Sequence, residues 1–373
     1  MIISTLRAKI ESTDYPIWIG NDLAGEIPGC IDSFTKSNRV FLLSDAVFKN
    51  GYCNQLEKIL RAQGFDVTVF YMSGGKAHKT IQSALRILDV LESMEFTRDA
   101  TFLTLGGGIV GDVGGFVAAT YFRGMNLVHI PTTITAQIDS SIGGKVAVNH
   151  NETINAIGTY YHPRAILLDM DFVTNLPERE FRSGMGEVIK SALIRDGAFC
   201  SFLLDNQAEL AARSPDFLPE MLQRTVRIKL DHVEQDPREK GIRLHLNYGH
   251  TIGQAIEIST SLEHEIYRHG EAVALGMLGA ARLADLYYGD GLNRVDVHRE
   301  LLHAYALPLH IDMHSIGMDT ASLKRSIYSN LFKDKKRVAG GIRFVLVPKL
   351  GMAEVITGIG ESEVRSAISS LFQ

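Results

Sequence analysis

Three residues in the C-terminal half of the chain have side chains that bind divalent metals: Glu187, His250 and His269. Two imidazoles and one carboxylate, with a fourth position open, form a common catalytic zinc set. The intervals between them, 63 and 19 residues, match no compact motif such as HExxH. Because the chain contains 13 histidines, spacing alone does not select these two, and each could equally serve as a helix cap, a core residue or a surface residue.

Lys190 follows Glu187 by three residues, so the two side chains share one face of a predicted helix. The simplest interpretation of this spacing is a solvated ion pair worth a few tenths of a kcal/mol. The alternative is that both charges belong to the same chemical site as the histidines.

A second pattern lies in the segment TFLTLGGGIVGD, where Gly106, Gly108 and Gly111 have the G-x-G-x-x-G spacing after a predicted strand. Such glycines let a backbone approach a pyrophosphate, which helix-terminal N–H groups then bind. The acidic ribose partner usual about 20 residues downstream is missing, because that region reads HIPTTIT. Asp45, at the end of an earlier predicted strand, offers an alternative partner. A turn needed only for packing also remains open.

The elements that must position these residues differ between the two parts of the chain. Short β-branched runs and amphipathic stretches alternate up to about residue 175, which predicts a parallel sheet covered by helices on both faces. The predicted strands are Arg39–Leu43, Val67–Tyr71, Thr101–Leu105, Leu127–Ile130 and Ala165–Asp169. After Leu176 helices predominate. We therefore expect two domains, 1–175 and 176–373, with a site in the cleft between them.

Composition excludes several classes of function. The 373 residues carry a net charge of −5, which argues against nucleic acid as the main partner. Three scattered cysteines form no disulfide framework or CxxC metal motif. The N-terminus lacks the apolar core of a secretory signal, and the longest apolar run, at 272–281, is too short to cross a bilayer. These features predict a cytoplasmic protein that does not bind membranes.

Taken together, several collinear segments resemble the 3-dehydroquinate synthase family of sugar-phosphate cyclases. The resemblance begins near residue 35 and extends to the C-terminus. It is carried by GGGIVGDVGGFVAATYFRGMNLVHIPTTITAQIDSSIGGKVAVNH, LPEREFRSGMGEVIK, LNYGHTIGQAIE and HGEAVALGM.

The resemblance implies an α/β fold with an N-terminal parallel-sheet NAD-binding domain and a C-terminal, mainly helical domain that binds metal and substrate. It also implies a homodimer. The expected substrate is a sugar-acid phosphate, 3-deoxy-arabino-heptulosonate 7-phosphate. Its conversion to 3-dehydroquinate involves transient oxidation by NAD, phosphate elimination, return of the hydride and an intramolecular aldol closure.

The resemblance also assigns roles by position. Glu187, His250 and His269 become the ligands of a divalent metal, zinc or cobalt. Six polar residues are implied around the ring hydroxyls and carboxylate: Asp139, Lys145, Lys190, Lys229, Arg243 and Asn247. Phosphate contacts are implied for Arg123, Asn155 and Lys336. With Asp45, the implied NAD site comprises Gly74, Lys79, Gly107, Gly108, Gly111, Asp112, Thr132, Thr133, Lys145, Phe172 and Asn175.

Three positions depart from the family pattern. Ile154 stands where relatives have a lysine, Gln254 where they commonly have a histidine, and Lys76 where they have an acid near the adenine ribose. The first two changes should weaken binding of a phosphate dianion, since charge-assisted hydrogen bonds are the stronger ones. The alternatives are an aminodehydroquinate synthase or another secondary-metabolic cyclase, a relative without catalysis, and a metal-dependent alcohol dehydrogenase.

Overall fold

The computed structural model describes residues 1–151, 153–260, 265–335 and 342–373 and contains two compact units. Unit 1 comprises Met1–Leu176 and Leu218–Leu230, and unit 2 comprises Pro177–Phe217 and Asp231–Gln373. The long helix α9 (Leu218–Gln235) therefore begins in unit 1 and ends in unit 2. The expected division near residue 175 places this whole helix in the second domain. The functions expected of the two domains stay predictions.

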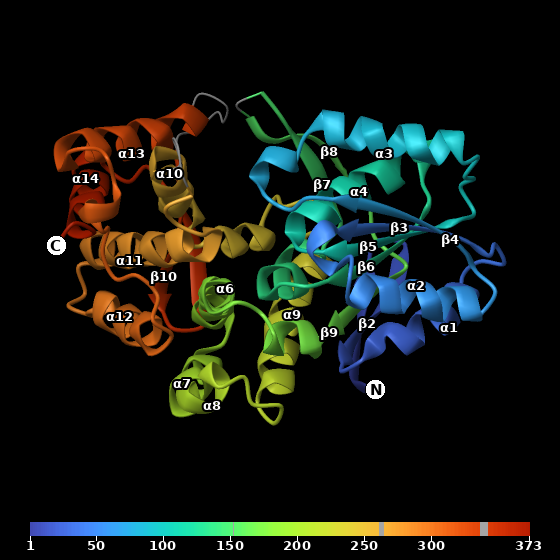
Figure 1. The fold of residues 1–373 in the computed structure, drawn as a ribbon. Helices are drawn as coiled ribbons and strands as arrows, with labels where there is room; N and C mark the ends of the chain where they lie inside the picture. Colours follow the sequence, from blue (N-terminus) through green and yellow to red (C-terminus); the bar gives the residue numbers. More distant parts are fainter. Residues whose placement is uncertain (152, 261–264, 336–341) are drawn as a thin grey trace. The chain divides into compact units, whose positions relative to one another are not determined.

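Unit 1 is built on a seven-stranded sheet with the order β1-β2-β9-β6-β5-β3-β4 (Figure 1). All neighbouring strands are parallel except β1 and β2, which are antiparallel. The strands are β1 (Ile2–Ile10), β2 (Thr13–Gly20), β3 (Arg39–Asp45), β4 (Asp66–Met72), β5 (Thr101–Gly106), β6 (Asn126–Pro131) and β9 (Ala165–Asp169). Every residue of β5 and β9 is buried, as expected of strands covered on both faces.

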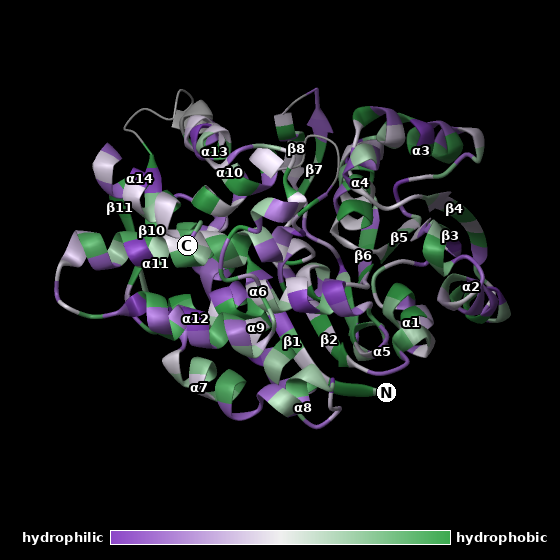
Figure 2. Ribbon diagram, turned by 60° about the vertical axis from the view of Figure 1, so that its left-hand side comes forward, coloured by the Kyte–Doolittle hydropathy of each residue, from purple (hydrophilic) through white to green (hydrophobic). Residues whose placement is uncertain are grey.

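Helices cover both faces of this sheet because successive strand residues point to opposite sides. Leu42 and Leu103 face the core formed with α2, whereas Phe41 and Phe102 face the core formed with α3 and α4. Figure 2 shows the hydrophobic colour of β6 and the alternating hydrophobic and hydrophilic residues of α3. The helices of this layer are α1 (Ile27–Asp32), α2 (Tyr52–Ala62), α3 (Ile81–Ser93), α4 (Gly108–Thr120) and α5 (Met170–Thr174).

In unit 1, two antiparallel hairpins were not predicted. One is β1–β2, and the other is formed by β7 (Lys145–His150) and β8 (Thr153–Tyr160). Most of β8 is exposed, so it lacks the hydrophobic alternation that identifies a half-buried strand. The five strands that the sequence predicts are all present, and their bounds agree to within two residues.

Unit 2 is mainly helical, and its central element is α11 (His269–Tyr288), which lies between α10 and α12 (Figure 1). Nearly all of the first sixteen residues of α11 are buried. The other elements are α6 (Glu178–Arg195), α7 (Gly197–Asp205), α8 (Gln207–Ala211), α10 (His250–Thr260), α12 (Arg294–Ala304), α13 (Thr320–Lys335), α14 (Glu361–Ser370), β10 (Arg343–Lys349) and β11 (Met352–Thr357). Within the described ranges, none of the helices combines the length and hydropathy required of a membrane span.

Candidate active site

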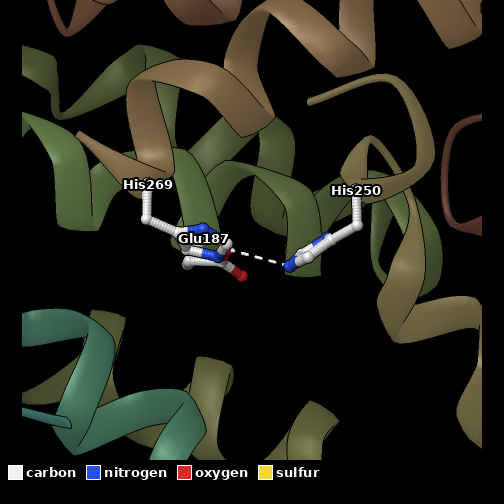
Figure 3. A group of neighbouring side chains, drawn as sticks. All are labelled: Glu187, His250 and His269. Atoms are coloured by element: carbon white, nitrogen blue, oxygen red, sulfur yellow. Dashed lines mark ion pairs between the residues drawn. The ribbon is translucent and has the colours of Figure 1, made fainter. Parts of the chain in front are cut away.

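Three helices of unit 2 bring Glu187, His250 and His269 together (Figure 3). Glu187 lies on α6, and the two histidines are the first residues of α10 and α11. One potential ligand atom from each residue lies within 4.8 Å of the others. The Nε2 atoms of His250 and His269 are 3.5 and 3.4 Å from Oε1 of Glu187. Residues separated by up to 82 positions therefore form one cluster.

The second nitrogen of each imidazole has its own acceptor. Nδ1 of His250 lies 3.1 Å from the backbone oxygen of Tyr248, and Nδ1 of His269 lies 3.1 Å from Oε2 of Glu257. In both rings Nδ1–H then donates to that oxygen, and Nε2 is the nitrogen directed at Glu187. Each ring is thus oriented so that Nε2 can bind a metal ion once it carries no proton.

The charges of this cluster are buried. Glu187 is 1% exposed and Lys190, whose Nζ lies 2.5 Å from its Oε2, is 2% exposed. The expectation of a solvated pair is therefore wrong: the spacing is that of an exposed ion pair, but α6 is buried around its last three turns. Burial opposes ionisation of Glu187, yet Lys190 and the histidines outweigh it and hold its pKa well below the usual range. Burial likewise opposes charge on His269, but Glu187 and Glu257 raise its pKa to about 10. The cluster favours a cation at this position.

Glycines explain how the helices approach closely enough. A Cβ on Gly270 would lie 1.7 Å from the oxygen of Ser183, and one on Gly186 would lie 2.5 Å from the oxygen of Gly270. A Cβ on Gly276 would similarly lie 1.9 Å from the oxygen of Gly249. Each of the three predicted metal ligands is adjacent in sequence to a glycine of one of these contacts, as Gly186-Glu187, Gly249-His250 and His269-Gly270. This adjacency is a signal that sequence reasoning missed.

The donor set fits a divalent metal ion. Two imidazole nitrogens and one carboxylate oxygen match a catalytic zinc site, which keeps one position for water or substrate. Both rings already present the correct nitrogen. The residues Glu187, His250 and His269 would therefore hold the ion.

In unit 1 the predicted cofactor residues gather at the carboxyl edge of the sheet. Asp45 ends β3, Gly107 follows β5 and Thr132 follows β6. These three strands are neighbours and parallel, so the residues lie at one edge, where open α/β sheets bind ligands. Gly74 lies beside Asp45, since a Cβ there would meet its Oδ2 at 2.6 Å.

Two of the ion pairs in this unit join predicted site residues. Lys79 contacts both Asp112, at 2.5 Å from Nζ to Oδ2, and Asn155. Lys229, on α9, lies 2.5 Å from Asp139. Burial raises the pKa of Asp112, Lys79 lowers it, and the charge of Asp139 adds to the rise. Three of the predicted cofactor and substrate residues, Lys79, Asp112 and Asn155, are therefore in direct contact.

Arg123 has a different location within unit 1. It precedes β6 and lines a cavity of about 230 Å³ with Arg98 and Arg164, which precede β5 and β9. This is the amino edge of the sheet, whereas Gly107 is at the carboxyl edge. The structure therefore does not bring Arg123 to the glycine turn of its own unit.

The remaining predicted residues are distributed as follows. In unit 2, Arg243 is 1% exposed and its Nη1 donates to the backbone of Pro237, while Asn247 donates to Glu239. In unit 1, Phe172 packs against Tyr52, and Asn175 donates to the backbone of its own helix. Lys145 is exposed at the start of β7, and Thr133, Gly108 and Gly111 lie in or beside the glycine turn. Lys336 lies outside the described residues.

The three departures from the family pattern are all on exposed side chains. Ile154 is 58% exposed on β8, and Gln254 is exposed one turn after His250. Lys76 is exposed in the loop after β4. None of the three substitutions is imposed by packing of the core.

Comparison with known proteins agrees with this geometry. The family model described as 3-dehydroquinate synthase N-terminal matches residues 69–183, and the C-terminal model matches residues 184–337. The chain belongs to the 3-dehydroquinate synthase family. A 3-dehydroquinate synthase of Desulforamulus reducens is 36% identical over 98% of this chain and 100% of its own length. That of Methylococcus capsulatus is 36% identical over 98% and 99%.

Solved structures show the same fold at lower identity. A 2-deoxy-scyllo-inosose synthase complexed with carbaglucose-6-phosphate, NAD+ and Co2+ is 24% identical, with a TM-score of 0.86 over 99% of this chain and 100% of that one. A 2-epi-5-epi-valiolone synthase from Streptomyces hygroscopicus, with NAD+ and Zn2+ bound, is 24% identical, with a TM-score of 0.83 over 98% of both chains. The expected dehydroquinate synthase-like α/β fold is confirmed.

Proposed function

We propose that the chain is a 3-dehydroquinate synthase, an NAD- and metal-dependent lyase that converts 3-deoxy-arabino-heptulosonate 7-phosphate into 3-dehydroquinate and phosphate. The observation that carries the proposal is the convergence of Glu187, His250 and His269 beside Lys190. It occurs in a chain that is 36% identical to 3-dehydroquinate synthases over nearly its full length.

The residues of unit 2 would perform distinct tasks. Glu187, His250 and His269 hold the metal ion, and Lys190 keeps Glu187 ionised by placing an ammonium against its carboxylate. When bound, NAD supplies a reversible hydride acceptor and the metal ion polarises the alcohol oxygen that is oxidised. Because Lys190 is almost fully buried, its ammonium remains a strong hydrogen-bond donor to substrate oxygens.

In unit 1, the carboxyl edge of the sheet is the proposed NAD site. Asp45 would accept hydrogen bonds from a ribose, and the N–H groups that open α4 after Gly107 would bind the pyrophosphate. Asp139 and Lys229 form a charged pair that can exchange protons or hydrogen bonds with sugar hydroxyls. Asn155 and Lys336 are the proposed phosphate contacts, and Arg123, at the opposite edge of the sheet, is not among them.

Arg243 favours a substrate that carries a carboxylate. A guanidinium binds a carboxylate with two parallel hydrogen bonds, and the near-complete burial of Arg243 would strengthen them. The amino analogue of the heptulosonate phosphate has the same carboxylate, so aminodehydroquinate synthesis is the second candidate. It is motivated by Ile154 and Gln254, the two departures from the family pattern that the notion of an ordinary phosphate site does not explain.

We also propose that the enzyme works as a homodimer in the cytoplasm. Sedimentation of the purified protein tests the first statement, and fractionation of the source cells tests the second. Neither statement affects the assignment of the metal and NAD residues.

The deciding experiment compares the two substrates. Purified protein with NAD and either zinc or cobalt is incubated with each heptulosonate phosphate, and phosphate release and the carbocyclic product are measured. We expect the plain substrate to give 3-dehydroquinate with no net NADH. Turnover of the amino substrate alone would overturn the first candidate in favour of the second. Net NADH with a simple alcohol would indicate a dehydrogenase, and no metal-dependent reaction would indicate a relative without catalysis.

A further inference from the structure

The two imidazoles of the metal cluster have chemically different supports. Nδ1 of His250 faces a neutral backbone oxygen, that of Tyr248, whereas Nδ1 of His269 faces the carboxylate of Glu257 at 3.1 Å. A backbone carbonyl fixes the orientation and tautomer of a ring. A carboxylate does the same and also makes the opposite nitrogen a stronger donor to a metal. Glu257 therefore has an influence on His269 that the carbonyl of Tyr248 does not have on His250.

The close crossing of α10 and α11 positions Glu257. It lies on α10, seven residues and two turns after His250, so both side chains are on the same face of that helix. A Cβ on Gly253, between them, would lie 2.7 Å from the oxygen of Ala272 in α11. This close crossing brings the carboxylate to the start of α11, where His269 lies. One helix thus supplies a ligand and the support of another ligand.

Burial makes this contact stronger than a surface ion pair. The side chain of Glu257 is 13% exposed, although His269 itself is 37% exposed. Exposed pairs contribute little because water and salt screen them, and a pair whose carboxylate is largely shielded from water retains more of its strength.

We propose that Glu257 is a positioning residue of the metal centre. Its carboxylate accepts the Nδ1–H of His269, holds Nε2 toward Glu187 and increases the electron density that His269 donates, so that affinity for a divalent ion depends on it. The inference rests on the proposed function only for the presence of a metal centre, and it is independent of which sugar phosphate is the substrate.

Two variants separate charge from contact. Glu257→Gln keeps the size and a carbonyl oxygen that can accept the Nδ1–H, but it removes the charge. Glu257→Ala removes both. Loss of such an outer partner typically weakens metal binding about 10- to 100-fold, so we expect about tenfold for Gln and about a hundredfold for Ala.

Glu271 provides a matched control, because it is another glutamate within two residues of His269. Its carboxylate pairs with Arg179 at 2.8 and 2.9 Å and accepts the backbone N–H of Arg268, which caps α11. Glu271→Gln therefore perturbs the start of α11 without removing the charge behind the imidazole. It measures the purely structural effect of losing an acid at this place.

The experiment uses full-length protein stripped of metal. Zn2+ is titrated in competition with a chromophoric chelator, the visible spectrum of the Co2+ form is recorded, and the thermal unfolding of each metal-free variant is measured. We expect Glu257→Gln to bind Zn2+ about tenfold more weakly and to shift the Co2+ bands, while Glu271→Gln retains both properties. The metal-free unfolding temperatures of the two variants should be similar.

Two results would overturn the inference and are distinguishable from failure of the proposed function. If the wild type binds Zn2+ tightly and Glu257→Gln binds it equally, Glu257 has no positioning role. The same conclusion follows if Glu271→Gln loses as much affinity as Glu257→Gln. If the wild-type protein binds neither ion, the metal centre itself is absent and the proposed function fails with it.

Discussion

The glycines at the two candidate sites have opposite roles. In unit 1 a Cβ on Gly107 would touch nothing closer than 3.4 Å, from Thr133. In unit 2 a Cβ on Gly270 or Gly276 would lie within 2 Å of a backbone oxygen. The first glycine leaves space beside the backbone, where a ligand can bind. The second kind allows two helices to pack at a distance that side chains forbid.

This difference explains how each site is encoded. The glycine turn and its strand occupy one short segment, because a ligand at the edge of a parallel sheet needs only a strand, a turn and a helix. The metal cluster is formed by three helices whose contributing residues are far apart in the sequence. Its geometry depends on how closely those helices pack, which no local pattern expresses.

The largest expected effect is that of His250→Ala. A metal ion that polarises a reacting oxygen contributes several kcal/mol, so we expect metal-dependent phosphate release to fall about 10³-fold or more. NAD binds to residues of unit 1 in our proposal, so its affinity should change little. Calorimetric titration with NAD and a phosphate-release assay measure the two effects. An equal loss of NAD affinity would contradict the assignment of metal and cofactor to different units.

Gly270→Ala should have the next largest effect. The added methyl group would meet the backbone oxygen of Ser183 at 1.7 Å, and α6 and α11 would have to separate. Overpacking of this kind costs about 1–3 kcal/mol, and it would move Glu187 away from His269. We expect weaker Zn2+ binding and a lower unfolding temperature.

Gly29→Ala in α1 is the control for that variant, since a Cβ there has nothing within 4 Å. It should stabilise the protein by up to about 1 kcal/mol, because alanine favours helix over glycine. If both alanine variants have the same stability, the close packing of α6 on α11 is not what requires Gly270.

Much of unit 1 could be predicted from sequence, and the exceptions have physical causes. β5 reads as a short run of apolar residues and threonines followed by glycines, so its place in the fold could be predicted. β8 could not be predicted because six of its eight residues are exposed. In unit 2 the predominance of helices could be predicted. The burial of Lys190 could not, because i,i+3 spacing looks the same on a buried and an exposed helix face. Glu257 was missed because its role depends on contact with His269 of α11, which the sequence around Glu257 does not show.

The two units can also be compared by the pH dependence of their stability, since each contains a buried neutral histidine. Burial lowers the pKa of His129 in unit 1 and of His298 in unit 2 to about 4. An unfolded histidine has a pKa of about 6.5. Between these values the histidine is protonated in the unfolded chain but not in the folded one. The free energy of unfolding therefore falls as the pH decreases from about 6.5 toward 4. At pH 5 each histidine should account for about 2 kcal/mol of that loss.

The measurement is chemical unfolding at pH 7.5 and pH 5 with a chelator present, so that metal binding does not contribute. His298→Gln should lose about 2 kcal/mol less than the wild type between the two pH values, although it is less stable at pH 7.5 because the bond from Tyr248 to His298 is altered. His150→Gln, at an exposed site, should follow the wild type. A decline as steep in His298→Gln as in the wild type would show that this histidine is not the group that titrates.

The smallest effect, and the sharpest contrast with Gly270, is expected for Gly107→Ala. Its backbone has a φ of −71°, which alanine adopts without strain, and the new methyl group meets only an ordinary contact with Thr133. Stability should therefore stay close to that of the wild type. NAD affinity should fall about tenfold, or ~1.4 kcal/mol, because the methyl group would occupy the space that a pyrophosphate needs next to the backbone. Equilibrium titration with NAD, alongside thermal unfolding, tests both parts. Unchanged affinity in a stable protein would mean that the nucleotide does not approach this turn.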